Sequence, residues 1–304
     1  MQIEVRENYE IKNLTTFKIG GKVDKLFIPK NQQELVYLLQ TLDNYTILGN
    51  CSNVLFSTNG YKGNLILTTG MNYCDIRGNH VISECGVKGP FLSQKTAKAG
   101  LSGFEFMIGF PGTIGGEIYM NASAHGQAIS DNLVRCCVFD NKKKEVIYKE
   151  KNELDFGYRK SVFQTNKYIL LGAEFELKKG KNEDIEALIN RNLQCRRDIQ
   201  PNLASPNAGS VFKNPPNDSA GRLLEKAGCK LMNCGNAKVW GNHANFIVNS
   251  GNATSENVLE LMLKMYTSVK EMFTIELVPE IVFIGEKTKK EEEICQILYR
   301  KNQK

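Results

Sequence analysis

The chain has 304 residues, of which 41% are hydrophobic and 24% charged, and its formal net charge at pH 7 is +6. This length allows two or three domains with a well-buried core, and the composition is ordinary for a soluble globular protein. Because no apolar run is long enough for a membrane helix and the first residues resemble neither a signal peptide nor a transit peptide, we expect a cytoplasmic protein that binds no membrane.

The first fifty residues are predicted to form a small α/β unit. Residues 23–28 have the composition of a strand, and residues 31–34 carry a capping-box pattern ahead of apolar residues that share one helical face. Residues 45–48 form a second short strand, which runs directly into a loop at residues 49–53.

Residues 54–180 alternate between short β-type runs and turns. One helix is predicted at residues 91–99, with Pro90 in its first turn and Gly100 at its end. The alternation favours an α+β region over a doubly wound one. The predicted strands cover residues 54–56, 64–68, 80–84, 134–140, 145–148 and 168–177.

The last third begins with a linking helix predicted at residues 183–197. Two further helices are predicted at residues 218–227 and 254–273, and the second has the apolar stripe of a core helix. A strand is predicted at residues 275–284. The tail from residue 286 ends in an amphipathic segment, which is either docked or frayed.

The segment at residues 109–126 is the most informative stretch of the chain. Glycine occupies positions 109, 112, 115, 116 and 126, and proline occupies position 111. A run this dense cannot stay a regular helix or strand for long. It can present several main-chain N–H groups to one anionic or planar ligand, although a plain glycine-rich surface loop has the same composition.

The loop at residues 49–53 also bears glycine, and its Ser52 and Asn53 side chains suit a pyrophosphate. Neither loop has the G-x-G-x-x-G spacing with an acidic residue about twenty positions on, which disfavours a Rossmann site. The chain also lacks the G-x-x-x-x-G-K-[ST] motif of P-loop enzymes.

The nine cysteines include no C-x-x-C pair, and none of the three histidines lies near a cysteine pair, so we expect free thiols and no metal site. The basic clusters at residues 142–144 and 287–290 lack interleaved aromatic residues, and we therefore predict no nucleic-acid binding. A mildly basic protein suits an anionic small substrate such as a nucleotide.

A few polar side chains are candidates for chemistry. Arg159 follows a tyrosine and either grips a carboxylate or pairs with a neighbouring acidic residue. Ser210 stands beside a glycine without the motif of a nucleophile elbow, so a turn role is also open. Glu280 lies in an apolar stretch, where a carboxylate is usually paired or functional. His243 is expected to pack or cap rather than to act in catalysis.

Together, these motifs resemble those of UDP-N-acetylenolpyruvoylglucosamine reductases, the flavoenzymes that make UDP-N-acetylmuramate for peptidoglycan. The resemblance covers nearly the whole chain, from about residue 13 to residue 285. It rests on the segments at residues 16–21, 49–53, 100–105, 109–126, 157–163, 209–215 and 279–285.

The resemblance implies a fold, cofactors and a reaction. The fold would be α+β, with a vanillyl-alcohol-oxidase/p-cresol-methylhydroxylase-type FAD-binding part in two α/β subdomains, at residues 1–60 and 61–200, and an α+β substrate domain at residues 201–304. Non-covalent FAD and the co-substrate NADPH would reduce UDP-N-acetylglucosamine enolpyruvate, with hydride passing from reduced flavin to C3 and a proton to C2. We expect a monomer.

The resemblance also implies roles for individual residues. By matching motif, Arg159 and Glu280 would stabilise the enolic intermediate, and Ser210 would donate the proton. The residues implied to bind FAD are Gly49, Asn50, Cys51, Ser52, Asn53, Gly109, Pro111, Gly112, Thr113, Gly115, Gly116, Asn121 and Ala122. Those implied to bind the substrate are Tyr158, Asn214, Lys230 and His243.

The chain departs from the family's usual motifs at several positions. Cys51 occupies the second glycine of the usual Gly-x-Gly-Ser-Asn loop, where a side chain constrains the backbone. Ser123 and His125 replace a glycine and a tyrosine, and Leu231 and Asn236 each replace a glycine. The short spacing between the arginine and serine candidates resembles members that lack an inserted substrate-covering loop.

Two other interpretations stay open. A different FAD oxidoreductase on the same fold would not be expected to carry the segment at residues 209–215 or the late Pro-Glu pair. A flavin- or nucleotide-binding protein without activity is disfavoured because Arg159, Ser210 and Glu280 are all present.

Overall fold

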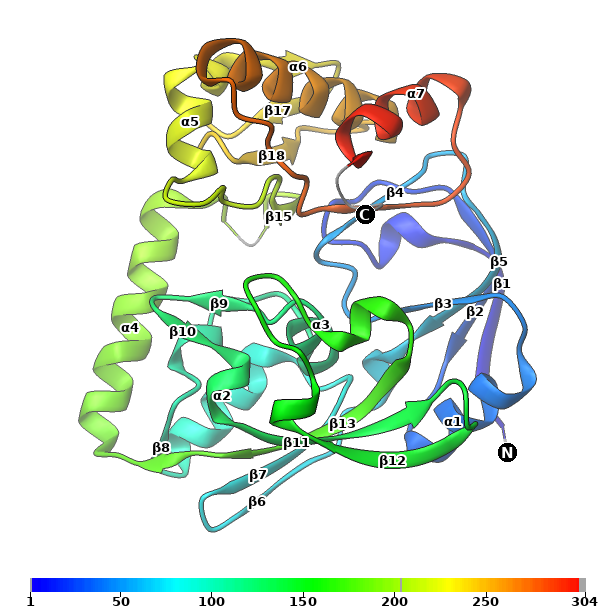
Figure 1. Ribbon diagram of the computed structural model, residues 1–304, viewed down its shortest axis with the longest axis vertical. Coiled ribbons are helices and arrows are strands. Elements are labelled where there is room, and N and C mark those ends of the chain that lie inside the picture. Colours follow the sequence, from blue (N-terminus) through cyan, green and yellow to red (C-terminus); the bar gives the residue numbers. More distant parts are fainter. Residues whose placement is uncertain (1, 203, 301–304) are drawn as a thin grey trace. The chain divides into compact units, whose positions relative to one another are not determined.

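The computed structural model describes residues 2–202 and 204–300. These residues divide by packing into two compact units, each of which is assembled from separate stretches of the chain (Figure 1). Unit 1 contains the segments Met1–Arg6, Leu26–Asn50 and Asn64–Arg196, and unit 2 contains Glu7–Lys25, Cys51–Gly63 and Arg197–Lys304. The predicted division of the chain into three functional parts stays a prediction.

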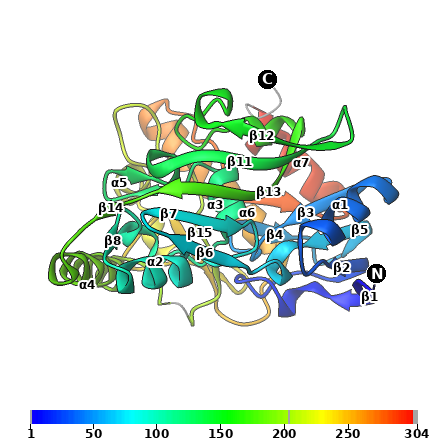
Figure 2. The same ribbon diagram turned by 90° about the horizontal axis from the view of Figure 1, so that it is seen from below.

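Unit 1 is organised around an antiparallel five-stranded sheet with the order β12-β11-β13-β7-β6 (Figure 2). Its large apolar side chains are buried in one core, in which Phe104 packs edge-on against Phe175 with 5.0 Å between the ring centroids. The strands of this sheet are β6 (Cys74–Arg77), β7 (His80–Glu84), β11 (Leu133–Asp140), β12 (Glu145–Glu150) and β13 (Tyr168–Glu176).

A second sheet has the strand order β1-β2-β5-β3, and the boundary between the units falls within three of its strands. Strands β3 and β5 pair in parallel in unit 1, with Tyr45 opposite Asn64. The strands are β1 (Glu4–Glu10), β2 (Lys22–Ile28), β3 (Tyr45–Leu48) and β5 (Tyr61–Leu67). Two-residue strands form the pairs β8 (Leu101–Ser102) with β14 (Lys178–Lys179) and β9 (Ser123–Ala124) with β10 (Gln127–Ala128).

The first helix of unit 1 begins where the sequence provides a cap. The Asn31 side chain accepts the Glu34 N–H at 2.9 Å, while the Glu34 carboxylate accepts the Lys30 N–H at 2.8 Å, which supplies both halves of a capping arrangement at the first helix. Pro90 lies in the first turn of the second helix, as predicted. The helices are α1 (Gln32–Thr41), α2 (Gly89–Lys98), α3 (Ile114–Tyr119) and α4 (Asn182–Ile199), the last of which crosses into unit 2.

Unit 2 contains a four-stranded sheet with the order β15-β18-β17-β16 and a parallel pair formed by β4 and β19. The apolar stripe predicted for the longest helix is buried in one core with residues of β17 and β18, which confirms its role as a core helix. The elements are β4 (Val54–Phe56), β15 (Asn207–Ser210), α5 (Ala220–Lys226), β16 (Asn233–Cys234), β17 (Ala237–Val239), β18 (Phe246–Asn249), α6 (Ser255–Phe273), β19 (Val282–Ile284) and α7 (Lys289–Leu298).

The strand predicted at residues 275–284 is wrong in its length, because only Val282–Ile284 form a strand. Leu277 and Ile281 before it are buried, but the chain there has no strand pairing apart from an isolated bridge between Phe212 and Pro279. Proline has no N–H to donate to a ladder, so a sheet cannot extend through this position. The apolar composition reflects burial here rather than pairing.

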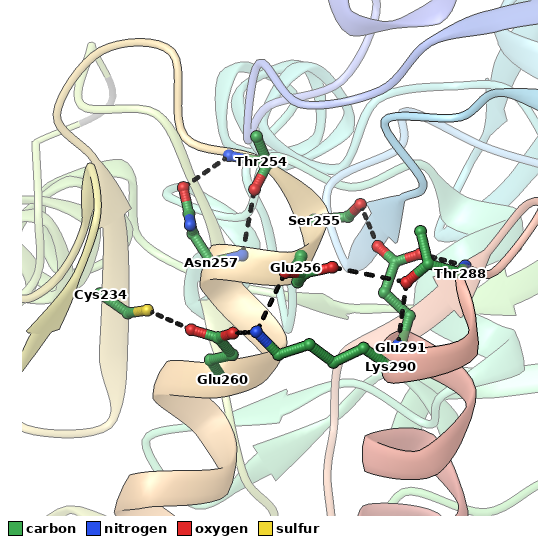
Figure 3. A network of polar contacts seen from close by, with 9 residues as sticks. All are labelled: Cys234, Thr254, Ser255, Glu256, Asn257, Glu260, Thr288, Lys290 and Glu291. Atoms are coloured by element: carbon green, nitrogen blue, oxygen red, sulfur yellow. Dashed lines mark hydrogen bonds and ion pairs between the residues drawn. The ribbon is translucent and has the colours of Figure 1, made fainter.

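The C-terminal helix α7 is docked, which decides between the two alternatives that the sequence left open. Ile294 and Leu298 are buried in the core of unit 2. Ion pairs also join α7 to α6: the Lys290 ammonium lies 3.1 Å from the Glu256 carboxylate and also pairs with Glu260 (Figure 3). Figure 1 shows α6 and α7 in orange and red at the same end of the unit.

Candidate functional site

The two glycine-bearing loops meet in unit 1. The Asn50 side chain donates a hydrogen bond to the Pro111 carbonyl at 2.6 Å. A Cβ atom at Gly49 would lie 2.2 Å from the Thr113 hydroxyl oxygen, so only glycine allows this approach. The structure therefore brings together four of the residues predicted to bind the cofactor.

Several main-chain N–H groups of the glycine-rich segment donate hydrogen bonds to other atoms of the protein. Thr113 caps α3 by accepting the Gly116 N–H at 3.4 Å. The Ile114 and Gly115 amides donate to the carbonyls of Val87 and Cys85 at 2.8 and 2.7 Å. A Cβ atom at Gly115 would lie 2.9 Å from that Cys85 oxygen. These contacts narrow the set of amides that the sequence predicted to face a ligand.

Two side chains of the same segment hold buried oxygen atoms without a hydrogen-bond partner among the described residues. They are both carboxyl oxygens of Glu117 and the amide oxygen of Asn121. Burial raises the pKa of Glu117 to about 8, against the opposing effect of Arg196. Glu117 is therefore mostly neutral at pH 7 and able to donate a hydrogen bond. Buried polar atoms are nearly always satisfied, so these oxygens suit a ligand.

Arg159 lies in unit 1 at the tip of a two-residue turn. Gly157 and Lys160 exchange both main-chain hydrogen bonds across the turn, at 3.1 and 3.2 Å. The Arg159 backbone is left-handed, with φ of +54°. Its guanidinium donates to the Ser123 hydroxyl at 2.9 Å and lies 5.1 Å from the ring centroid of Tyr158, whose side chain is exposed.

Ser210 and Glu280 are brought together in unit 2. The Glu280 amide donates to the Val211 carbonyl at 2.8 Å, so the chain at Glu280 lies directly beside the residue that follows Ser210. The pairing of β15 with β18 shifts register between Asn207 and Ser210, and Gly209 there has a φ of +76°. The irregularity lies just before the half-buried Ser210, which pairs with Phe246 in the ladder.

A buried amide that the sequence analysis missed fixes this arrangement. Asn245 accepts the Phe212 N–H at 2.9 Å and donates to the Phe212 carbonyl at 2.8 Å. Its own carbonyl accepts the Val211 N–H at 2.9 Å. An asparagine directly before the apolar strand β18 is the signal that sequence analysis could have used, because a buried amide there needs main-chain partners.

The loop residues Cys51 and Asn53 also lie in unit 2. Asn53 donates from its side chain to the Glu280 carbonyl at 3.1 Å, and its own carbonyl accepts the Val282 N–H at 3.1 Å. Thr16 joins the other side, because its amide donates to the Cys51 carbonyl at 3.4 Å and its hydroxyl donates to the Asn207 carbonyl at 2.7 Å. Within unit 2, residues 51–53 of the predicted cofactor loop are therefore bonded to the main chain at Glu280 and linked through Thr16 to Asn207 of β15.

Cys51 has a φ of +50°, the left-handed backbone that the glycine of the usual motif would favour. Its side chain is 3% exposed, and burial raises the pKa of the thiol to about 12. The thiol is consequently protonated and unreactive at neutral pH. Its effect on cofactor affinity stays a prediction.

The remaining predicted substrate residues also lie in unit 2. Asn214 accepts the Ala220 N–H at 3.0 Å, at the start of α5, and Lys230 pairs with Glu225 at 2.6 Å. His243 accepts the Asn245 N–H at 3.1 Å, and its ring packs edge-on against a phenylalanine. Burial lowers the pKa of His243, which keeps the ring neutral. His243 thus packs and caps, as the sequence predicts.

Comparisons with known proteins agree along the chain. Residues 200–284 match the family model described as "UDP-N-acetylenolpyruvoylglucosamine reductase, C-terminal domain", and residues 23–145 match the model described as "FAD binding domain". UDP-N-acetylenolpyruvoylglucosamine reductases of Caldicellulosiruptor saccharolyticus and Caldicellulosiruptor bescii are 41% and 42% identical, over 94% and 93% of this chain and 94% and 92% of theirs. The crystal structure of the Thermus caldophilus enzyme is similar with a TM-score of 0.80, at 32% identity, over 93% of this chain and 99% of that one.

Proposed function

The chain belongs to the UDP-N-acetylenolpyruvoylglucosamine reductase family, and from this premise we propose that it reduces UDP-N-acetylglucosamine enolpyruvate to UDP-N-acetylmuramate for peptidoglycan synthesis. It is an FAD-dependent oxidoreductase that takes its electrons from NADPH. Its fold is the vanillyl-alcohol-oxidase type of FAD-binding fold, joined to a C-terminal substrate domain. The observation that carries the proposal is the main-chain contact that holds Glu280 beside the residue after Ser210.

Features of unit 1 fit FAD. The close approach of Gly49 to Thr113 leaves no room for a side chain between the two loops. The partnerless buried oxygens of Glu117 and Asn121 would be satisfied by hydrogen-bonding groups of the cofactor. When bound, FAD supplies the two-electron transfer between NADPH and the enolpyruvyl group. We propose that the predicted residues of loops 49–53 and 109–126 hold it without a covalent bond.

The charged and polar side chains would act on the enolpyruvyl group. The Arg159 guanidinium would pair with the substrate carboxylate and stabilise negative charge as it develops there. Ser210 would give the proton to C2, and Glu280 would stabilise the enolic intermediate. A serine is a weak acid, so its proton transfer needs a neighbouring cation or a water relay.

The remaining substrate residues, the oligomeric state and the domain boundaries are proposals of the same kind. We propose that Tyr158, Asn214, Lys230 and His243 contribute to the substrate site, with His243 acting through Asn245. We also propose a cytoplasmic monomer whose parts at residues 1–60, 61–200 and 201–304 are two FAD-binding subdomains and a substrate domain. Among the residues described, no helix combines the length and the apolarity needed to cross a membrane.

The flavin spectrum tests the proposed function. Acid precipitation of the purified protein should release all of its flavin into the supernatant. Under anaerobic conditions, NADPH should bleach the visible flavin band, and the enolpyruvyl substrate should restore it, whereas UDP-N-acetylglucosamine should not. A band that NADPH bleaches but the enolpyruvyl substrate leaves unchanged would contradict the proposal.

A further inference from the structure

The position of the Arg159 guanidinium needs an explanation, because arginine has a long side chain with many rotamers. Its backbone sits in the left-handed turn between Gly157 and Lys160, and its carbonyl accepts the Gln164 side-chain N–H at 3.0 Å. These contacts fix the main chain of the turn. They do not by themselves select one direction for the side chain.

The turn is tied to the glycine-rich segment at alternate residues. The Ser161 hydroxyl donates to the Tyr119 carbonyl at 2.7 Å, and the Asn121 side chain donates to the Gly157 carbonyl at 2.9 Å. The third tie is the 2.9 Å hydrogen bond from Arg159 Nη1 to Ser123 Oγ. Among these three ties, only that one holds the arginine side chain itself.

Ser123 is itself held in a fixed place. It belongs to strand β9 and lies opposite Ala128 of β10 in a hairpin closed by His125 and Gly126. Both turn residues have positive φ, of +53° and +79°, as a type I′ hairpin turn requires. The Ser123 hydroxyl is therefore presented from a short, well-defined element.

The chemistry of the acceptor matters as much as its position. A serine oxygen accepts a hydrogen bond without carrying charge, whereas a carboxylate at the same place would neutralise the guanidinium. Arginine has five N–H donors, of which the bond to Ser123 uses one. A glycine at this position, as in the usual motif, offers no side-chain acceptor.

From this geometry we infer that Ser123 is a positioning residue, which orients the Arg159 guanidinium toward the substrate carboxylate without itself bringing a charge to it. The inference rests on the proposed function of Arg159. It adds a residue to the site through a side chain that the usual motif lacks.

The first test needs no substrate. A double-mutant cycle of Ser123→Ala and Arg159→Ala should show coupling in urea unfolding of the FAD-loaded protein, with a factor of about five in the unfolding equilibrium constant, because the hydrogen bond is lost in either single variant. Additive effects would overturn the inference. Ser123→Thr, which keeps a hydroxyl, should preserve most of the coupling.

The second test is kinetic and separates the inference from the proposed function. In Ser123→Ala, flavin reoxidation by the enolpyruvyl substrate should slow by about tenfold, whereas flavin reduction by NADPH should not change. Ser123→Thr should restore most of the rate, and Ser102→Ala, a serine of β8 in the same unit, should match the parent protein. A parent protein that the substrate does not reoxidise would refute the proposed function. Normal reoxidation in both the parent and Ser123→Ala would overturn the positioning role alone.

Discussion

The two units hold their parts of the candidate site by opposite means. In unit 1, neighbouring atoms exclude a side chain at two glycines: the Thr113 hydroxyl at Gly49 and the Cys85 carbonyl at Gly115. The turn that carries Arg159 is left-handed at that residue. In unit 2, side-chain amides hold the main chain around Ser210 and Glu280, through the buried Asn245 and the half-buried Asn53. Adding an atom should therefore damage unit 1, whereas removing an amide should damage unit 2.

The largest effect on stability is expected for Asn245→Ala. The change leaves the N–H and the carbonyl of the buried Phe212 without their partners, which should lower the free energy of unfolding by about 3 kcal/mol. Urea unfolding measures it. Asn233→Ala, at an exposed residue of β16, should stay within about 0.5 kcal/mol of the parent. Equal effects of the two changes would break the comparison.

The next effect is expected for Gly115→Ala. The added Cβ would lie 2.9 Å from the Cys85 carbonyl oxygen, and we expect overpacking to cost about 2 kcal/mol of unfolding free energy. Gly116→Ala is the matched control, since its Cβ would come no closer than 3.7 Å to the nearest atom. In a helix, that change should be neutral or stabilising by up to about 1 kcal/mol. Thermal unfolding measures both variants, and equal stabilities of Gly115→Ala and Gly116→Ala would contradict the idea that a side chain is excluded at Gly115.

For Glu117→Gln we expect an increase in the free energy of unfolding, which depends on pH. Burial raises the pKa of Glu117 from 4.5 to about 8, so the folded protein loses stability as pH rises between these two values. Glutamine cannot ionise, so the variant should gain stability over the parent at pH 8 relative to its effect near pH 4.5. Thermal unfolding at both pH values measures the gain. Glu153→Gln removes an exposed carboxylate whose pKa is lowered by Lys149, and it should show no such gain.

The smallest effect is expected for Cys51→Gly. Glycine adopts the left-handed backbone at this position without the strain that a Cβ atom causes, and this strain is about 1 kcal/mol. Its removal should tighten FAD binding by up to about fivefold. FAD titration of the stripped protein measures the affinity. Cys51→Ala removes the thiol but keeps the Cβ atom, so it should bind FAD like the parent. If alanine improves binding as much as glycine does, the thiol rather than the backbone limits affinity.

Much of the fold could be predicted because local signals agree with it. Capping residues marked α1, and the apolar stripe of α6 identified it as a core helix. The strand at residues 275–284 was overpredicted, since an apolar run reports burial and does not say whether the chain pairs with a neighbouring strand. The two-residue strands β9 and β10 are too short to give a periodic signal.

Residues of the candidate site could be predicted only where they belong to a recognisable sequence motif. The loops at residues 49–53 and 109–126 were singled out by their glycines, and their contact through Asn50 follows from the structure. Ser123 and Asn245 act through hydrogen bonds to residues distant in the chain, which no local pattern reveals. Glu117 lies in the first turn of a helix, where an acidic residue is usually exposed, so its burial could not be predicted either.

The most direct test of the central claim is anaerobic stopped-flow measurement of the two half-reactions in Ser210→Ala. If Ser210 donates the proton to C2, reduction of the flavin by NADPH should stay nearly intact, while reoxidation by the enolpyruvyl substrate should slow by about 100-fold. Ser268→Ala, on the exposed side of α6, should leave both rates unchanged. Equal slowing of both half-reactions in Ser210→Ala, or no change in either, would contradict the account.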